Sequence, residues 1–393
     1  MKGIAVRALD ANGYYLFDTL VERQREKKFP YDMRDAFIPQ KVIPSQMRSD
    51  TFVLACFYFY VCLYMRGGIK SLQAFAAMLR MYHDHPKLFD PAYAQYLQPA
   101  ELQLVIAKYV GWDAKAVAGF WIENSKRLVR KWNGDPRNIV KGLDNYEEAL
   151  RRIQNKATAS RKVREEADAI YGNGLGFMGF QPKMVSMFIY FMDWDNLLPI
   201  KFLYPAPADF HNFRLALSHQ ALVLDPMPIT YRVNEALSVA WRNMMMRYLK
   251  DRGNVTPVEL ADALWLFSLV LCGESPLTMY KEPQVIEGQL GPANDPGDEL
   301  FPHDKTMMHF SSKRRRNDLK RTCLACPILN TCTLAIPAAP YYQRKDGREG
   351  AWGGQLLLQA RPVIESTYKP MPVKFSGWTG KSVVEELYEL FDE

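Results

Sequence analysis

The stretch Phe177-Met178-Gly179-Phe180-Gln181-Pro182-Lys183, which leads into an apolar segment from Val185 to Met192, carries the clearest structural signal in this chain. Glycine lets the backbone turn sharply, and a continuous apolar segment flanked by such a turn is typical of an element buried in a protein core. The stretch therefore predicts a turn that leads into a buried helix.

A helical pattern extends outward from this stretch over most of the chain, beginning near Ser49. Apolar residues recur at intervals of three and four, which is the spacing of one face of a helix. This spacing predicts helices at 71–79, 100–110, 114–129, 146–153 and 256–271. Thr256 followed by Pro257 is a favourable helix start, because proline fits the first helical position. Strand signals are few, so the chain is predicted to be mostly α.

The composition is that of a globular protein: 393 residues, of which 48% are hydrophobic and 24% charged. The longest apolar run, Thr51 to Met65, is shorter than the roughly 20 residues that a membrane span needs, and predicts a core helix instead. The first ten residues lack the apolar segment of a signal peptide. We therefore expect a cytoplasmic protein (associated with the nucleoid, or nuclear if the source is eukaryotic) that does not bind a membrane.

The net charge of +7 is unevenly distributed along the chain. The last eleven residues carry five acidic residues and no basic one, so the rest of the protein is more basic than the total suggests. Basic clusters lie at 126–131, 151–152, 161–164 and 313–316. Such a distribution favours a polyanionic partner, because phosphate contacts dominate affinity for nucleic acids. A solvated basic surface without a partner is the alternative.

Three of the six cysteines, Cys323, Cys326 and Cys332, form a C-x2-C-x5-C pattern. Thiolates at this spacing converge on a metal ion or an iron–sulfur cluster, and a [4Fe–4S] cluster is favoured over zinc because zinc sites usually pair two such motifs. A cluster of this type needs a fourth ligand. Cys272 is the main candidate, and His303 and His309 are alternatives. The remaining two cysteines, Cys56 and Cys62, lie in the apolar run and are predicted to be structural.

Taken in order, these features resemble the helix-hairpin-helix DNA glycosylases, specifically the endonuclease III and adenine-mismatch branch that carries a [4Fe–4S] cluster. Members of that family have a Leu-Pro-Gly-Val-Gly-x-Lys hairpin, then Val-Asp-x-His-x-x-Arg, then C-x6-C-x2-C-x5-C. In this chain the hairpin corresponds to 179–183 and the second motif to Asp209-x-His211-x-Phe213-Arg214. The three clustered cysteines correspond to the last three ligands. The resemblance covers about 49–332, and its sharp motifs lie in the second half.

The chain departs from the family pattern at three places. Gln181 stands where the hairpin has its second glycine, and Lys183 and Asp209 are 26 positions apart, which indicates an extra loop around 193–207. Arg316 stands where the first cysteine of the family motif would fall. We therefore predict that Cys272 is a relocated ligand and that the basic loop is enlarged.

The resemblance implies a role for each of these residues. Asp209 would stabilise the positive charge that develops on the sugar as a base leaves, or activate a nucleophile. Lys183 would attack the sugar carbon and form a Schiff base that leads to strand scission. His211 and Arg214 would support Asp209. The residues expected to contact DNA are Gly179, Gln181, Lys313, Arg314, Arg315 and Arg316. Without the resemblance, Lys183 would be a solvated or phosphate-binding lysine, and Asp209 an ordinary helix N-cap.

The predicted organisation follows from these motifs. We expect an N-terminal extension (1–48), a helical domain (49–205) with its hairpin at 175–192, a domain with the catalytic Asp and the cluster (206–333), and a C-terminal extension (334–393) with an acidic helix. The resemblance implies a monomeric glycosylase, with a possible lyase activity, that flips a damaged or modified base out of double-stranded DNA.

Two alternatives remain open at the level of the sequence. One is a DNA-binding relative that retains the fold and the cluster but is not catalytic. The other is a glycosylase for bulky hypermodified bases, such as those of phage DNA, because the long segment between Lys183 and Asp209 and the loop 273–308 could shape a larger pocket.

Overall fold

A computed structural model describes residues 4–28, 30–65, 71–109, 114–155, 176–228, 230–269, 326, 328–335, 341–343, 349–351 and 355–360. The chain divides into two compact units. Unit A consists of Met1–Met33 with Ala208–Trp378, and unit B of Arg34–Pro207 with Thr379–Glu393. The described residues are mostly helical with little strand, which confirms the predicted mostly α class. The acidic segment Ser382–Phe391 lies outside the described residues.

The described part of unit B consists of helices and short connections. Its α-helices are α2 (Arg34–Phe37), α3 (Ser45–Ser49), α4 (Thr51–Tyr64), α5 (Ser71–Asp84), α6 (Pro91–Ala94), α7 (Pro99–Tyr109), α8 (Ala114–Trp132), α9 (Arg137–Val140), α10 (Tyr146–Ile153) and α12 (Pro182–Trp194). Short 3-10 helices η2 (Pro39–Val42) and η3 (Pro86–Phe89) connect some of them. The helices predicted at 71–79, 100–110, 114–129 and 146–153 are thus present, and the turn before α12 leads into a buried helix as predicted.

Helix α4 forms the centre of unit B. Every residue from Leu54 to Tyr64 is buried, and the helix packs against α3, α5, α8 and α12. The ring of Tyr60 stacks on that of Trp121 with 4.1 Å between centroids, and its hydroxyl bonds Ser125. Burying aromatic rings on all sides of one helix supplies most of the apolar burial of this unit. The apolar run 51–65 is therefore a core helix, as predicted.

The described part of unit A combines helices with four two-stranded antiparallel sheets. Its helices are α1 (Asp10–Arg25), η1 (Tyr31–Met33), α13 (Phe210–Ser218), α14 (Glu235–Arg252), α15 (Pro257–Phe267) and η6 (Leu329–Thr331). Its strands are β1 (Ala5–Ala8), β2 (Leu222–Asp225), β3 (Thr230–Arg232), β4 (Leu334–Ala335), β5 (Tyr341–Gln343), β6 (Glu349–Ala351), β7 (Gln355–Leu357) and β8 (Gln359–Ala360). They pair as β1–β2, β3–β7, β4–β8 and β5–β6.

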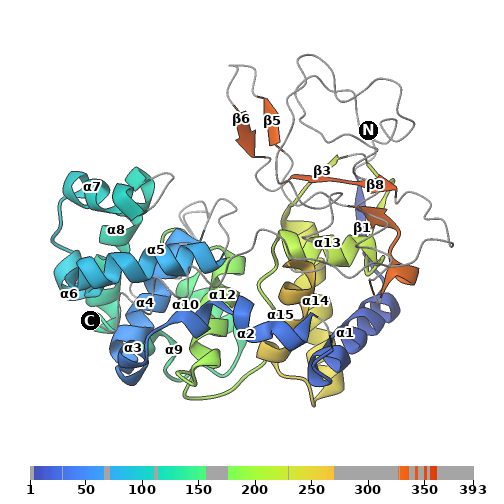
Figure 1. Ribbon diagram of the computed structural model, residues 1–393, viewed down its shortest axis with the longest axis horizontal. Helices are drawn as coiled ribbons and strands as arrows, with labels where there is room; N and C mark the ends of the chain where they lie inside the picture. The colour runs from blue at the N-terminus through green and yellow to red at the C-terminus, as the bar shows by residue number, and fades with distance from the viewer. Residues whose placement is uncertain are drawn as a thin grey trace. The chain divides into compact units, whose positions relative to one another are not determined.

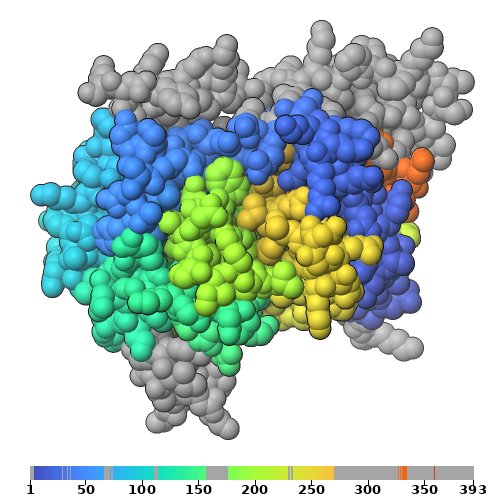
Figure 2. Space-filling model, turned by 90° about the horizontal axis from the view of Figure 1, so that it is seen from below, coloured from blue at the N-terminus to red at the C-terminus, as the bar shows by residue number. Residues whose placement is uncertain are grey.

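Helix α1 belongs to the core of unit A, although residues 1–45 show no clear period in the sequence. It packs against α14 and α15, and β1 pairs with β2 from Ala5 opposite Asp225 to Ala8 opposite Leu222 (Figure 1). In the space-filling view, the yellow atoms of α14 and α15 abut dark blue atoms of the N-terminal region (Figure 2). A Cβ atom at Gly13 would lie 2.1 Å from Sδ of Met244, so glycine permits the close approach of α1 to α14.

The start of α15 follows the prediction made at Thr256. The Thr256 hydroxyl accepts the backbone N–H of Glu259, and the Glu259 carboxylate in turn accepts the backbone N–H of Thr256. Pro257 occupies the first helical position, where its missing N–H costs no hydrogen bond. This capping box fixes the N-terminus of the helix that packs against α13.

Candidate functional site

A glycine turn precedes α12 and positions Lys183. Gly176 and Gly179 have φ angles of +64° and +86°, which are unfavourable for residues with a side chain. A Cβ atom at Gly176 would lie 2.0 Å from the backbone oxygen of Gln154, so no larger residue fits there. Gly179 is buried, whereas Gln181 is exposed at the N-terminus of α12.

Two polar residues of α8 hold this turn from the inside. Asn124 is completely buried, donates from Nδ2 to the backbone oxygen of Met178 (2.8 Å) and accepts the Met178 N–H (2.7 Å). Arg127, which is also buried, donates from Nη1 to the backbone oxygen of Gly176 (2.6 Å). Because buried backbone groups need partners, these side chains stabilise one conformation of the turn. The sequence reasoning missed Asn124, although a polar residue on the apolar face of α8 is a detectable signal.

We predict that Asn124→Ala destabilises the fold by about 2–4 kcal/mol, because it leaves the N–H and C=O of Met178 buried without their partner. The free energy of unfolding is measured by urea denaturation. Asn138→Ala is the control, since that half-buried side chain donates a hydrogen bond to Trp132 (2.9 Å) and its loss should cost about 1 kcal/mol. Equal effects of the two variants would contradict the proposed role of Asn124.

Lys183 is the second residue of α12 and is half-buried. The first turn of this helix is fixed by Tyr146, whose hydroxyl donates to the backbone oxygen of Pro182 (3.1 Å) and lies 2.7 Å from Oγ of Ser186. The amine is therefore presented from a helix N-terminus with a fixed backbone. A lysine in such a setting suits contact with an anion or, when deprotonated, attack on a carbon.

The basic run 126–131 on α8 separates into a buried and an exposed part. Arg127 is buried in the turn and also bonds Glu123 (2.8 Å), whereas Lys126, Arg130 and Lys131 are exposed. Exposed cations on the helix that holds the glycine turn give this part of unit B a positive surface. Such a surface attracts a polyanion, and the attraction weakens as salt rises.

Asp209 is the N-cap of α13. Its Oδ1 accepts the backbone N–H groups of His211 (3.0 Å) and Asn212 (3.3 Å), and the side chain of Asn212 lies at 3.4 Å. The residue is half-buried at the positive end of the helix dipole. Hydrogen-bond donors and the helix N-terminus favour a negative charge here. The predicted catalytic carboxylate is thus also a helix cap, and both readings of Asp209 describe the same side chain.

The residues around Asp209 form a buried polar support. Arg214 donates to the backbone oxygen of Ser268 (3.1 Å) and packs 4.6 Å from the ring centroid of Phe210. His211 lies 3.3 Å from Oγ of the same serine, and Trp241 donates from Nε1 to Asn212 (3.2 Å). His211 and Arg214 therefore hold α13 against the segment that follows α15, in agreement with a supporting role.

Lys183 belongs to unit B and Asp209 to unit A, and each is described within its own unit. The predicted loop 193–207 is anchored by two carboxylates of unit B. Asp193 bonds Lys201 and Tyr204 (2.9 Å to the tyrosine hydroxyl), and Asp195 bonds Arg48 (2.5 Å) and Tyr58. Burial and the neighbouring Asp195 carboxylate raise the pKa of Tyr58, so its hydroxyl stays protonated and donates.

Of the predicted cluster ligands, the structure describes Cys326 and Cys332, which lie on either side of η6 and are partly exposed. Cys272, Cys323, His303, His309 and the basic run Lys313, Arg314, Arg315 and Arg316 lie outside the described residues, so their assignment stays a prediction. Within the described ranges, no group of three or more His, Cys, Asp or Glu side chains is arranged to hold a metal ion.

The donor chemistry of the cysteines distinguishes the two predicted classes. Cys326 and Cys332 are partly exposed thiols five residues apart, which suits them to ligation of iron or zinc. Cys56 and Cys62 are buried in α4, and burial raises the pKa of both thiols, so they remain protonated there. The latter pair is structural, as the sequence suggests.

We predict that the purified protein is brown, with broad absorption near about 400 nm and roughly four iron and four sulfide ions per chain. Cys332→Ala should lower the iron content severalfold, whereas Cys62→Ala, in the core helix, should not change it. Metal analysis of both variants checks this expectation. A colourless protein with about one zinc ion per chain would show that the zinc alternative is correct.

In the described parts of the chain, no helix combines the length and the hydropathy needed to cross a membrane. No family model matches the chain, and no curated protein is found to match it.

Proposed function

We propose that this protein is a DNA glycosylase of the helix-hairpin-helix type that excises a damaged or modified base from double-stranded DNA. The proposal includes a two-domain helical glycosylase fold with a [4Fe–4S] loop, action as a monomer in the compartment that holds the DNA, and a lyase activity through Lys183. The observation that carries it is the setting of Asp209, a half-buried carboxylate fixed at a helix N-terminus by backbone donors and a buried polar support.

Asp209 suits the first chemical step. When the bond between base and sugar breaks, the bonding electrons leave with the base and positive charge develops on the sugar. A carboxylate held near the anomeric carbon stabilises that charge without having to reorganise, which is where an enzyme gains most electrostatically. The hydrogen bonds to His211 and Asn212 restrict the carboxylate to one orientation.

Lys183 suits the second step. A deprotonated amine attacks the sugar carbon as the base departs, and loss of the ring oxygen as leaving group gives a protonated Schiff base. Removal of a proton from the adjacent carbon then expels the 3′ phosphate and cuts the strand. Hydrolysis of the imine regenerates the lysine. The proposal requires that Lys183 and Asp209 act on the same nucleotide.

The DNA contacts that we propose use surfaces of unit B. The exposed cations Lys126, Arg130 and Lys131 would neutralise phosphates, and the turn at Gly179 and Gln181 would approach the backbone. These contacts would offset the few kcal/mol needed to flip a base out of the helix. The basic residues 313–316 are proposed to add further phosphate contacts.

The proposed cysteine ligands, Cys272, Cys323, Cys326 and Cys332, would hold a cluster whose chemistry is to cross-link this segment of chain. The described end of the segment is attached to α13: Thr333 donates its N–H to the backbone oxygen of Ser218 (2.7 Å), and Thr331 lies 2.7 Å from Nδ1 of His219. The same helix carries Asp209 at its other end, so the segment supports the position of the carboxylate.

A panel of labelled duplexes tests the proposal. Each duplex carries one damaged, mismatched or enlarged base, and base release is followed by chromatography and strand cleavage by gel electrophoresis. Release of at least one base, lost in the Asp209→Asn variant, is the expected result. Release of only the bulky bases would identify the variant reading in which the pocket is enlarged. Binding without release from every duplex would instead indicate a non-catalytic relative.

A further inference from the structure

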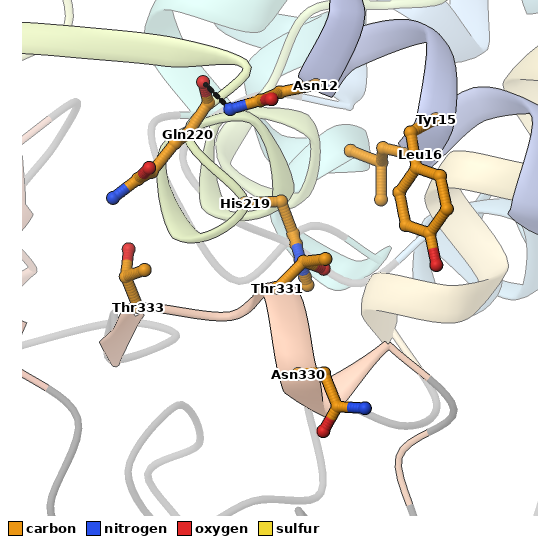
Figure 3. A pocket seen from close by; sticks show the side chains of 8 residues that line it. All are labelled: Asn12, Tyr15, Leu16, His219, Gln220, Asn330, Thr331 and Thr333. Carbon is orange, nitrogen blue, oxygen red and sulfur yellow. Dashed lines mark hydrogen bonds between the residues drawn. The ribbon is translucent and has the colours of Figure 1, made fainter.

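A cavity of about 390 Å³ lies in unit A, between α1, the C-terminal end of α13 and the residues around η6. Figure 3 shows Tyr15 on one side of it, Gln220 and Thr333 on the other, and His219 between them. None of the described side chains that line it belongs to Asp, Glu, Lys or Arg. Its volume falls in the range of small-molecule sites, and its uncharged lining disfavours a phosphate as the group that enters.

The hydrogen bonds at its base fix the polarity of His219. The Thr331 hydroxyl donates its only proton to the backbone oxygen of Ile328 (3.1 Å), so it must accept the contact from Nδ1 of His219 (2.7 Å). A neutral histidine that donates through Nδ1 has an acceptor at Nε2. His219 is buried, and the ring therefore offers this cavity an acceptor.

Two further side chains have their polarity fixed in the same sense. Asn12 donates from Nδ2 to the backbone oxygen of Gln220 (3.2 Å), which leaves Oδ1 as its remaining polar atom, an acceptor. Thr333 donates its hydroxyl proton to the backbone oxygen of Ser218 (3.2 Å), so its oxygen acts as an acceptor. The lining is thus rich in acceptors, and it favours a ligand that presents N–H or O–H donors.

Tyr15 adds an aromatic surface to this arrangement. The residue is 56% exposed, which leaves its ring available for stacking on a flat ligand. We propose that this cavity binds a nucleobase that carries an exocyclic amino group, adenine or cytosine. The choice of a base over other donor-rich ligands rests on the proposed function. The base comes either from a free nucleoside or from an unpaired position in DNA.

This site is distinct from the proposed catalytic carboxylate. Asp209 caps the N-terminus of α13, while His219 follows its last residue, so about 13 Å of helix separates the two ends. A base bound here is therefore not the one released at Asp209. In a DNA complex, the cavity would hold a second, unpaired base and contribute to the choice of site.

The experiment compares ligands that differ in the amino group alone. Ligand-observed NMR and calorimetry of the full chain use adenosine against inosine and cytidine against uridine. Because inosine and uridine place an acceptor where the amino group was, they should bind at least about tenfold more weakly. Tyr15→Leu should weaken adenosine binding about tenfold, and Asn12→Leu severalfold. Tyr96→Leu, at a 79% exposed tyrosine of unit B, is the matched control and should change nothing.

A second arm distinguishes the two sources of the base. Duplexes with a single bulged adenine or a bulged hypoxanthine are compared for affinity in wild type and Tyr15→Leu. Preference for the bulged adenine that disappears in Tyr15→Leu assigns the site to DNA, whereas a preference confined to nucleosides assigns it to a free ligand.

Equal binding of all four nucleosides, equal binding of glucose, or no binding at all would overturn the proposal. Base release is scored separately in the same variants. Intact release without nucleoside binding would refute this cavity as a base site while leaving the glycosylase proposal in place. Nucleoside binding in a protein that releases no base would do the reverse.

Discussion

Asp209→Asn is expected to lower the rate of base release at least about 100-fold while DNA binding and stability stay close to wild type. A neutral amide cannot compensate the positive charge that develops on the sugar. Asparagine is nevertheless as good an N-cap as aspartate, so Oδ1 can still accept from His211 and Asn212. Single-turnover base release measures the effect, and the change in unfolding free energy should stay below about 1 kcal/mol.

The chain supplies a matched control in Asp50, the N-cap of α4. Its Oδ1 accepts the backbone N–H groups of Phe52 (3.0 Å) and Val53 (3.1 Å), which is nearly the geometry found at Asp209. Asp50→Asn should therefore change stability as little as Asp209→Asn does, and leave base release unaffected. If the two variants release base at the same rate, Asp209 is a structural cap and the site assignment is wrong.

Lys183→Ala is expected to abolish the covalent protein–DNA adduct that borohydride traps, and to slow strand cleavage at least about 100-fold. The Schiff base can form only through an amine placed at the sugar carbon. Trapping on a duplex with the released base, followed by denaturing electrophoresis, measures the adduct. Base release should persist, because water can take the place of the amine as nucleophile.

Lys115 provides the control for this substitution. It is the second residue of α8, as Lys183 is the second residue of α12, and it is exposed. Lys115→Ala should retain the trapped adduct in full. An adduct that survives in Lys183→Ala would move the nucleophile to another residue. No adduct in the wild-type protein, combined with base release, would mark a glycosylase without lyase activity.

Local sequence patterns were sufficient to predict the core of unit B. Helices α4, α5, α7, α8, α10 and α12 have apolar residues at helical spacing, and the signals for their ends lie within a few residues of those ends. At the end of α8, for example, Asn133 and Gly134 both adopt positive φ angles. Because these signals act over a few residues, they can be read without knowledge of the tertiary fold.

Helix α1 could not be predicted in this way. It starts after Leu9, which provides no side-chain cap, and it contains Gly13, which is a weak helix former. It is stabilised instead by burial of Leu16, Phe17, Leu20 and Val21 and by ion pairs such as Arg25 with Glu259 (2.6 Å). These partners lie more than 200 residues away in the chain. Long-range packing thus decided this element.

The candidate site divides along the same line. The sequence by itself determined the mostly helical fold and singled out Lys183, Asp209 and the cysteine pattern, because motifs of this kind depend on short spacings. Only the tertiary structure showed that Asn124 holds the turn at Met178, 54 positions later, and that residues of α1, α13 and η6 enclose a cavity rich in acceptors. The physical reason is that hydrogen-bond polarity and cavity shape arise from groups brought together across the chain, and neither is encoded in any one segment.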